Sequence, residues 1–254
     1  MNKTATTFLT AMVLLLVLIT VTAQDKGKAW SEWSKKEAEK VLNDSPWAQT
    51  QVDTDTSQMF YSPTSDPRMT GVRSNSTTDS RIGQGATNQE VSIKFHVRFF
   101  SARPIRRALV RLMELQQKPT PEIAQRLTNF AEMEAKDSII VTVTFESNDQ
   151  RFSGPVMQAF NSAATGTLKN DAYLERNDGK RIFLEEYVPP GKDGFGARFI
   201  FLRELNGQPF VTAGTTDVRF VVQFPRAKSA DPNGLKIDRR FKIADMVLNG
   251  APEL

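Results

Sequence analysis

The sequence contains no cysteine and a single histidine among its 254 residues. The absence of cysteine excludes disulfide bonds, thiolate ligands for zinc, a cysteine nucleophile and a lipid-modified cysteine anchor. With one imidazole, the chain also lacks the second histidine that many metal sites need. We therefore expect no bound metal or cofactor, and a fold that is stabilised by its core without covalent cross-links.

Charge is scarce in the first two dozen residues. Lys3 is the only charged residue before an apolar run from Phe8 to Val21, which is followed by Thr22 and Ala23. A basic start, a short apolar run and a small-residue end are typical of a secretory signal peptide. Residues 1–23 are therefore predicted to be cleaved, which places the protein in the periplasm or outside the cell. The alternative is a membrane anchor formed by residues 1–23, although a helix of about 24 Å is short for a bilayer core of about 30 Å.

Tryptophan is rare, and all three tryptophans lie in the segment 24–48. Ser34 and Glu37 have the spacing of a capping box, which predicts a short helix from there to about Leu42. Either the helix docks on the folded domain and the indoles fill that contact, or the indoles form a patch for a partner or a membrane interface. The residues concerned are Trp30, Trp33 and Trp47.

Residues 49–90 are poor in apolar side chains, with eight among 42 positions. Such a segment buries too little surface to offset the entropy lost on ordering. We predict a polar linker that is largely irregular, with a short edge strand at Gln58–Tyr61.

Beyond residue 90, apolar and polar residues alternate in short segments, as in half-buried strands. Turn signals separate these segments, the clearest being Asn177-Asp178-Gly179. The segment Arg198–Leu205 is apolar on both faces, which predicts a central strand. The predicted strands are 91–99, 139–145, 173–176, 181–188, 198–205, 218–224 and 235–243. Residues 91–254 are therefore predicted to be mainly β, an antiparallel immunoglobulin-like β-sandwich, with a jelly roll or an open barrel as alternatives.

A helical insertion at residues 103–135 interrupts the strands. Pro104 begins one helix, for which Ser101 is a candidate cap, and Thr120-Pro121-Glu122 begins another. Lys118–Thr120 is too short for anything but the turn of an antiparallel αα-hairpin. A shorter helix is predicted from about Pro155 to Ala163.

The first helix of this hairpin carries a candidate interaction surface. The segment from Lys94 to Arg111 has six basic residues and no acidic residue. Four of the arginines fall on one arc of the helix, where they can bind phosphates or carboxylates. The alternative is a solvated face balanced by Glu114, Glu122 or Glu132. The four residues are Arg103, Arg106, Arg107 and Arg111.

Catalytic signatures are missing. His96 is the only imidazole, and no G-x-S-x-G motif accompanies it, so an ordinary histidine is favoured over a triad base. The glycine-rich segment Gly191–Gly196 lacks the spacing of a phosphate loop. Glu185 and Glu186 point to opposite faces of one strand, unlike the facing carboxylates of a glycosidase. No catalytic residue is predicted.

Two stretches resemble a known group. The run from Trp33 to Ala48 contains Leu42-Asn43-Asp44-Ser45-Pro46-Trp47-Ala48 and is similar to an N-terminal signature of uncharacterised bacterial exported proteins. Phe99–Arg106, a strand that runs into a helix started by proline, resembles the same group. The resemblance covers about a tenth of the chain. It implies export and a shared architecture, and it brings no functional residues.

The sequence favours an exported, non-catalytic binding or structural module of the cell envelope. An acidic envelope component or another exported protein is the expected partner. Export makes nucleic acid an unfavoured partner, and membrane contact is expected only if residues 1–23 are retained. The alternative is a hydrolase whose carboxylates converge only in the fold.

Overall fold

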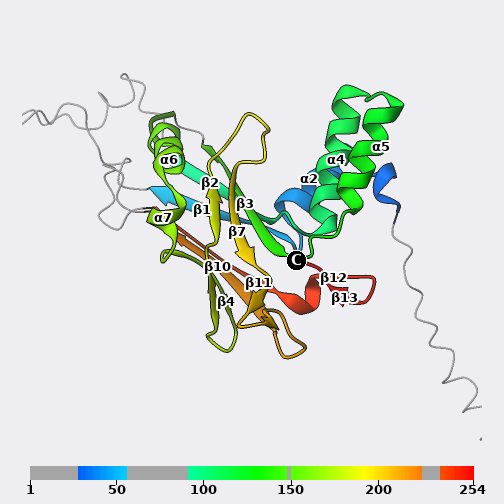
Figure 1. Ribbon diagram of the computed structural model, residues 1–254. Helices are drawn as coiled ribbons and strands as arrows, with labels where there is room; N and C mark the ends of the chain where they lie inside the picture. The colour runs from blue at the N-terminus through cyan, green and yellow to red at the C-terminus, as the bar shows by residue number, and fades with distance from the viewer. Residues whose placement is uncertain (1–27, 56–90, 148–149, 225–234) are drawn as a thin grey trace, which may run out of the picture. The chain divides into compact units, whose positions relative to one another are not determined.

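The computed structural model describes residues 28–55, 91–147, 150–224 and 235–254 (Figure 1). The predicted signal peptide, most of the predicted linker and the predicted strand at Gln58–Tyr61 lie outside these residues. The chain divides into two units, Met1–Trp33 and Ser34–Leu254. In the first unit the structure describes a short 3₁₀ helix, η1 (Trp30–Glu32), where the Trp33 indole donates a hydrogen bond to the Lys28 carbonyl. The second unit is the domain described below.

Two antiparallel sheets form this domain, which confirms the predicted mainly β, antiparallel class. The five-stranded sheet has the order β1-β2-β3-β7-β6, and the four-stranded sheet has the order β11-β10-β4-β5. The strands of the first are β1 (Ala48–Asp55), β2 (Val91–Phe99), β3 (Ser138–Ser147), β7 (Ala197–Leu202) and β6 (Glu186–Val188). Those of the second are β11 (Lys236–Lys242), β10 (Asp217–Gln223), β4 (Ala172–Arg176) and β5 (Arg181–Phe183). Two ribbons are formed by β8 (Glu204–Leu205) with β9 (Gln208–Pro209) and by β12 (Val247–Leu248) with β13 (Ala251–Pro252).

Phenylalanine side chains fill the space between the sheets. The rings of Phe199 on β7 and Phe220 on β10 meet edge to face, with their centroids 5.2 Å apart. Phe99 on β2 and Phe241 on β11 make a similar contact at 4.8 Å. All four side chains are fully buried. Edge-to-face ring pairs add to the burial of apolar surface, and this core stabilises the domain without disulfides.

The two sheets are joined along one border by glutamine side chains. On β1, the Gln49 side-chain amide donates to the Arg240 carbonyl of β11 at 2.7 Å. The Gln51 amide donates to the Lys236 carbonyl and accepts from the Asp238 amide, both at 2.9 Å. We name this border the glutamine seam. Side-chain amides replace the backbone ladder there and satisfy edge groups that would otherwise be open to another strand.

The opposite border is crossed by the chain itself. The predicted strand 181–188 is two strands, because Leu184 and Glu185 carry the chain from one sheet to the other. The Leu184 amide donates to Ala172 of β4, and the Glu185 amide donates to Ile200 of β7. A single segment therefore continues from β5 in the four-stranded sheet to β6 in the five-stranded sheet.

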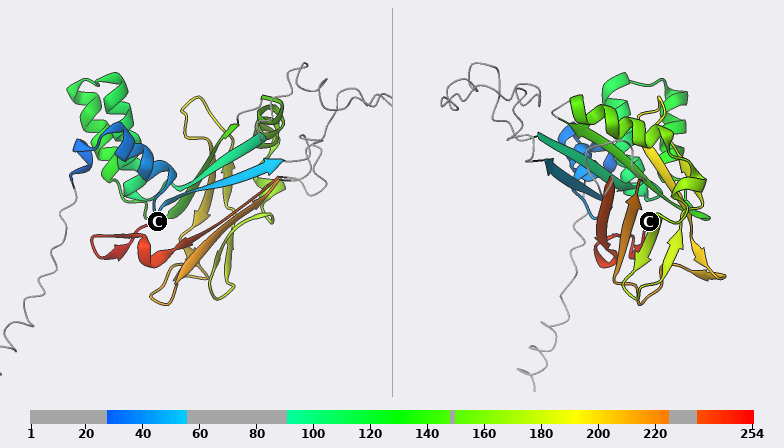
Figure 2. Two further views of the ribbon diagram at one scale, coloured as in Figure 1. Left: turned by 180° about the vertical axis from the view of Figure 1, so that it is seen from behind. Right: turned by 90° about the vertical axis from the view of Figure 1, so that its left-hand side faces the viewer.

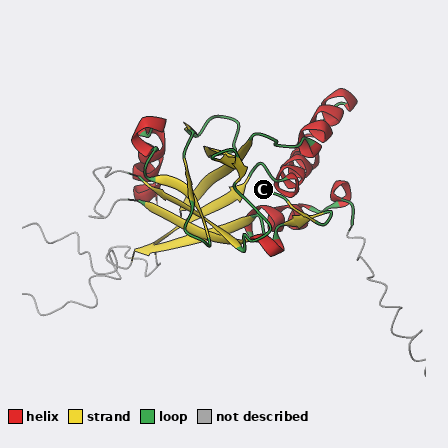
Figure 3. Ribbon diagram, turned by 60° about the horizontal axis from the view of Figure 1, so that its bottom comes forward, coloured by secondary structure: helices red, strands yellow, loops and turns green. Residues whose placement is uncertain are grey.

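Helices lie toward both ends of the five-stranded sheet (Figures 2 and 3). The predicted αα-hairpin is confirmed as α4 and α5, and α2 packs against α4, β1 and β2. The predicted capping box of α2 is also present, with Ser34 and Glu37 bonding each other's backbone amides. The helices are α2 (Lys35–Asn43), α4 (Arg103–Gln117), α5 (Pro121–Glu132), α6 (Gln150–Ser162), α7 (Thr165–Leu168) and the 3₁₀ helix η3 (Ile243–Asp245).

Several predicted boundaries were wrong. The predicted linker begins with β1, a polar strand that forms because it pairs with β2 along its full length. Ser101 does not cap α4: the N-cap is Ala102, and the buried Ser101 hydroxyl accepts from the Ile140 amide at 3.0 Å. Helix α6 begins before Pro155 and includes it. The predicted turn at Asn177-Asp178-Gly179 is confirmed by a positive φ angle at Gly179, and Asn206-Gly207 forms a second turn with positive φ angles.

Candidate interaction surface

The four arginines predicted to share one solvated arc of α4 have different surroundings. Arg106 is 2% exposed and does not face solvent, which corrects the predicted arc. The helical periodicity placed Arg106 opposite the apolar face, but α4 packs against α5 and also against α2. The buried residues of α2 are Ala38 and Leu42, and Val110 of α4 is buried as well. The helix therefore has two covered sides, and only part of the predicted polar face remains open.

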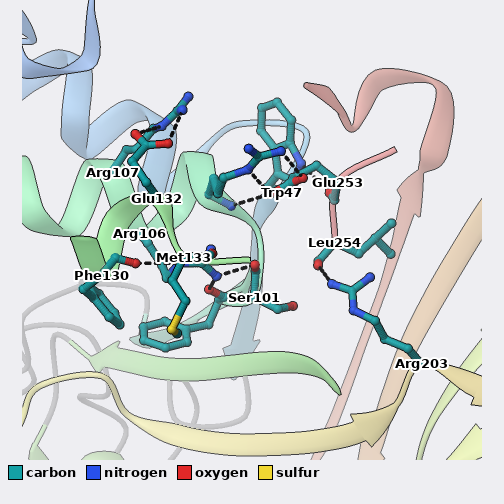
Figure 4. Close-up of polar contacts among 12 residues, drawn as sticks. Trp47, Ser101, Arg106, Arg107, Phe130, Glu132, Met133, Arg203, Glu253 and Leu254 are labelled. Carbon is teal, nitrogen blue, oxygen red and sulfur yellow. Dashed lines mark hydrogen bonds and ion pairs between the residues drawn. The ribbon is translucent and has the colours of Figure 1, made fainter. Parts of the chain in front are cut away.

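Arg106 binds four backbone carbonyl groups (Figure 4). Its guanidinium donates to Phe130 and Phe100 at 3.2 Å, and to Ser101 and Met133. Phe130 and Met133 are at the end of α5, where carbonyls have no partner within the helix. Phe100 and Ser101 belong to the connection from β2 to α4. This one side chain therefore fixes the base of the αα-hairpin to the sheet, and its role is structural.

Arg103 and Trp47 hold the end of the chain in place. Arg103 makes a bidentate ion pair with Glu253, at 2.8 and 2.9 Å, and its backbone amide donates to the same carboxylate. The Trp47 indole donates to the Glu253 carbonyl at 2.8 Å. Beside them, Leu254 is buried, and its carbonyl accepts from Arg203. Trp47 is thus partly buried inside the domain, as the docking interpretation of the tryptophans predicts for this residue.

Arg107 and Arg111 are balanced by glutamates, as the solvated-face interpretation predicts. Arg107 makes a bidentate ion pair with Glu132 of α5, at 2.8 and 2.6 Å. Arg111 lies 3.3 Å from Glu114 on its own helix. The predicted anion-binding arc is therefore a set of internal contacts, and the arginines give no reason to expect an acidic partner.

His96 lies on the outer face of the five-stranded sheet, between two neighbouring strands. Its Nδ1 is 2.9 Å from the Thr50 hydroxyl on β1, and its Nε2 is 3.5 Å from Glu146 on β3. Lys94 and Arg98 flank it on β2, and Arg98 is itself bonded to the Leu42 carbonyl at the end of α2. Burial lowers the pKa of Arg98 to about 10. Burial first, and then the charge of Arg98, lowers the pKa of His96, which Glu146 only partly offsets.

We expect the free energy of unfolding to fall as the pH drops below about 6.5, the pKa of an unfolded histidine. In that range the unfolded chain binds a proton that folded His96 does not yet accept. The domain has one histidine, so proton NMR of its imidazole C–H signals reports the folded pKa without assignment. A His96→Asn variant should lack this component of the pH dependence. A measured pKa at or above 6.5 in the folded protein would contradict the prediction.

Apolar side chains are exposed at the tip of the αα-hairpin. Leu115, near the end of α4, is 43% exposed, and Ile123, near the start of α5, is 48% exposed. Only Ala131 is buried among the twelve residues of α5. The predicted apolar face of the hairpin is therefore covered at its base and open toward its tip.

A second apolar area lies on the outer face of β3 and β7. Side chains alternate along β7, so Phe199 and Phe201 enter the core while Ile200 and Leu202 face outward. Ile200 pairs with Ile140 of β3, and both are partly exposed. Leu202 is 51% exposed. The predicted central strand is confirmed, because β7 lies between β3 and β6, but it ends at Leu202 and the second sheet covers only one of its two apolar faces.

Met133 extends this area toward the hairpin. It follows α5 directly, is 56% exposed, and its carbonyl is bound by the same guanidinium as the carbonyl of Ser101. Ser101 in turn is bonded to the backbone of Ile140. We name the set formed by Met133, Ile140, Ile200 and Leu202 the outer strip. Sequence reasoning noted the apolar character of Ile200 and Leu202 but had no signal that they stay exposed.

An aromatic cluster borders the outer strip. The ring of Phe100, at the end of β2, lies 5.1 Å from Phe195 and 5.9 Å from Phe130, measured between centroids. Phe195 belongs to the glycine-rich segment Gly191–Gly196. Gly196, the next residue, comes so close to β3 that an added Cβ would lie 2.3 Å from the Val143 carbonyl oxygen.

The imidazole and carboxylate side chains of the described residues do not gather into a metal site. No group of three or more His, Asp or Glu side chains in residues 28–55, 91–147, 150–224 and 235–254 could hold a metal ion. Within the same ranges, no helix has the length and apolar character needed to cross a bilayer. Comparison with known proteins finds no matching family model, curated protein or solved structure.

Proposed function

We propose that this protein is an exported, non-catalytic module of the cell envelope that binds another exported protein through its αα-hairpin and the adjoining sheet face. Export rests on the features of residues 1–23, and an immunoglobulin-like connectivity stays a prediction on which this function does not depend. The observation that carries the proposal is the contrast between charged and apolar groups. The arginines of α4 are engaged inside the domain, whereas Leu115, Ile123, Met133 and Leu202 are exposed.

The carboxylates support this choice over a hydrolase. Glu253 and Glu132 are held in bidentate pairs by Arg103 and Arg107, and Asp238 is bound by Arg219. The Arg219 guanidinium lowers the pKa of Asp238. A general acid needs a carboxyl group whose pKa is raised instead. No observation on the described residues favours the hydrolytic alternative.

The hairpin tip gives a direct test. We expect Leu115→Glu with Ile123→Glu to reduce retention of the purified protein on envelope fractions at least fivefold, because carboxylates are costly to bury in an apolar contact. The matched control is Phe183→Glu, a 47% exposed aromatic residue on β5, which should leave retention unchanged. Circular dichroism confirms that each variant is folded. Equal retention of all three proteins would overturn the proposed role of the hairpin.

A further inference from the structure

We propose that the outer strip binds a basic, amphipathic segment of a partner polypeptide. This inference rests on the proposed function, since it names the chemistry of the partner. The strip joins two exposed side chains, Met133 and Leu202, to the cross-strand pair Ile140 and Ile200. The sheet already orders Ile140, Ile200 and Leu202, so an apolar stripe of a partner can be buried against these three side chains with little further loss of entropy.

Acidic residues surround the strip although the whole chain carries a net charge of +4. Glu186 is paired directly with Ile200 on the outer face, and Glu204 follows Leu202 by two residues. Glu134 and Asp137 follow Met133 before β3 begins. All four acidic residues are exposed. Three cations are close: Arg198 is paired with Asp193 at 2.9 Å, Lys136 lies 3.9 Å from Glu134, and Arg203 is bonded to the Leu254 carbonyl. With Asp193 there are five acidic residues against these three cations, so the surroundings keep a negative excess. Charge complementarity therefore selects a basic segment.

The charge around the strip favours a polypeptide over an anionic membrane. The α4–α5 hairpin lies at one end of β3 and α6 at the other (Figures 1–3). The Phe160 ring of α6 packs against Phe145 and Phe224 in the core, so α6 covers the core side of the sheet and not the outer face that carries the strip. The acidic residues around the strip repel anionic lipid headgroups.

A pair of model peptides tests the proposal. One is a fluorescent 14-residue peptide with leucine on one helical face and lysine on the other, and its match has glutamate in place of lysine. We expect fluorescence anisotropy to show at least tenfold tighter binding of the lysine peptide, weakening with salt. Leu202→Lys should reduce this affinity at least tenfold, and Glu186→Gln with Glu204→Gln should reduce both the affinity and its salt dependence. Phe183→Lys, on the other sheet, should change the affinity less than twofold.

The absence of cysteine allows the site to be mapped with a single label. An environment-sensitive dye on Leu202→Cys should shift its emission to shorter wavelength when the lysine peptide binds, and the same dye on Phe183→Cys should not. Equal shifts at both positions, or no effect of Leu202→Lys, would overturn the proposal.

Two further outcomes would assign the strip to another occupant. Binding to phosphatidylglycerol vesicles that Leu202→Lys abolishes would identify a membrane. A dimer in sedimentation velocity that Leu202→Lys dissociates would identify a second copy of the chain. Either result would replace the basic segment. The two proposals can fail separately. If the strip binds the lysine peptide but the hairpin variants keep their retention on envelope fractions, only the proposed role of the hairpin is overturned.

Discussion

Replacing Arg106 with methionine is expected to lower the free energy of unfolding by about 3–5 kcal/mol. The side chain is 2% exposed, and its guanidinium donates to the carbonyls of Phe100, Ser101, Phe130 and Met133. Methionine fills similar space but has no donor, so four carbonyls lose their partner in a site that water enters poorly. Urea denaturation followed by circular dichroism measures the loss, with an unchanged m-value as evidence that the unfolding reaction is the same.

Arg107→Met, one residue along the same helix, is the matched control. Arg107 pairs with Glu132, and both side chains still reach solvent, with 20% and 38% of their surface exposed, so the ion pair contributes about 1 kcal/mol. We therefore expect a loss several times smaller than for Arg106. Similar losses for the two variants would mean that the buried carbonyl contacts do not stabilise the hairpin base.

Gly196→Ala is expected to lower the free energy of unfolding by about 2–5 kcal/mol. The backbone of Gly196 has a φ of +80°, a conformation that costs a residue with a Cβ about 1–2 kcal/mol. The added Cβ would also lie 2.3 Å from the Val143 carbonyl oxygen and 2.6 Å from Thr144, so that β3 or the loop must move. Overpacking of this kind costs about 1–3 kcal/mol.

Gly194→Ala separates the two contributions. Gly194 has a similar φ of +76°, but among the described residues no atom beyond its two chain neighbours lies within 4 Å of the position that an added Cβ would take. Gly194→Ala should therefore lower the free energy of unfolding only by the cost of the backbone conformation, about 1–2 kcal/mol. Thermal unfolding of both variants under one set of conditions makes the comparison. Equal destabilisation would show that the loop moves away from β3 without cost.

Local patterns were sufficient where neighbours in sequence determine the structure. The alternation in β2 and β10, the Asn177-Asp178-Gly179 turn and the proline-started helices of the αα-hairpin were predicted from the sequence and are present. Each depends on a period of two or 3.6 residues, or on the φ preference of a turn residue. Tertiary contacts were not needed to recognise them.

The remaining features depend on segments that are distant in sequence. Strand β1 is polar because Gln49 and Gln51 bond to β11, so its composition resembled that of a linker. Arg106 is buried because carbonyls from two other segments converge on it. The outer strip is exposed because the second sheet covers only the opposite face of β7. The sequence could not show this, since a strand that is apolar on both faces can be covered on both or exposed on one.

The glutamine seam has a consequence for the order in which the domain assembles. Its hydrogen bonds, and the one from Trp47 to Glu253, connect residues that are 185 to 206 positions apart. In a chain that emerges from its N-terminus first, β1 appears early but cannot meet these partners until residues 236–253 have emerged as well. Contacts of such long range form slowly, since a long loop must close first. The α4–α5 pair, whose contacts are local, can form much sooner, so the two sheets close only after β11 has emerged.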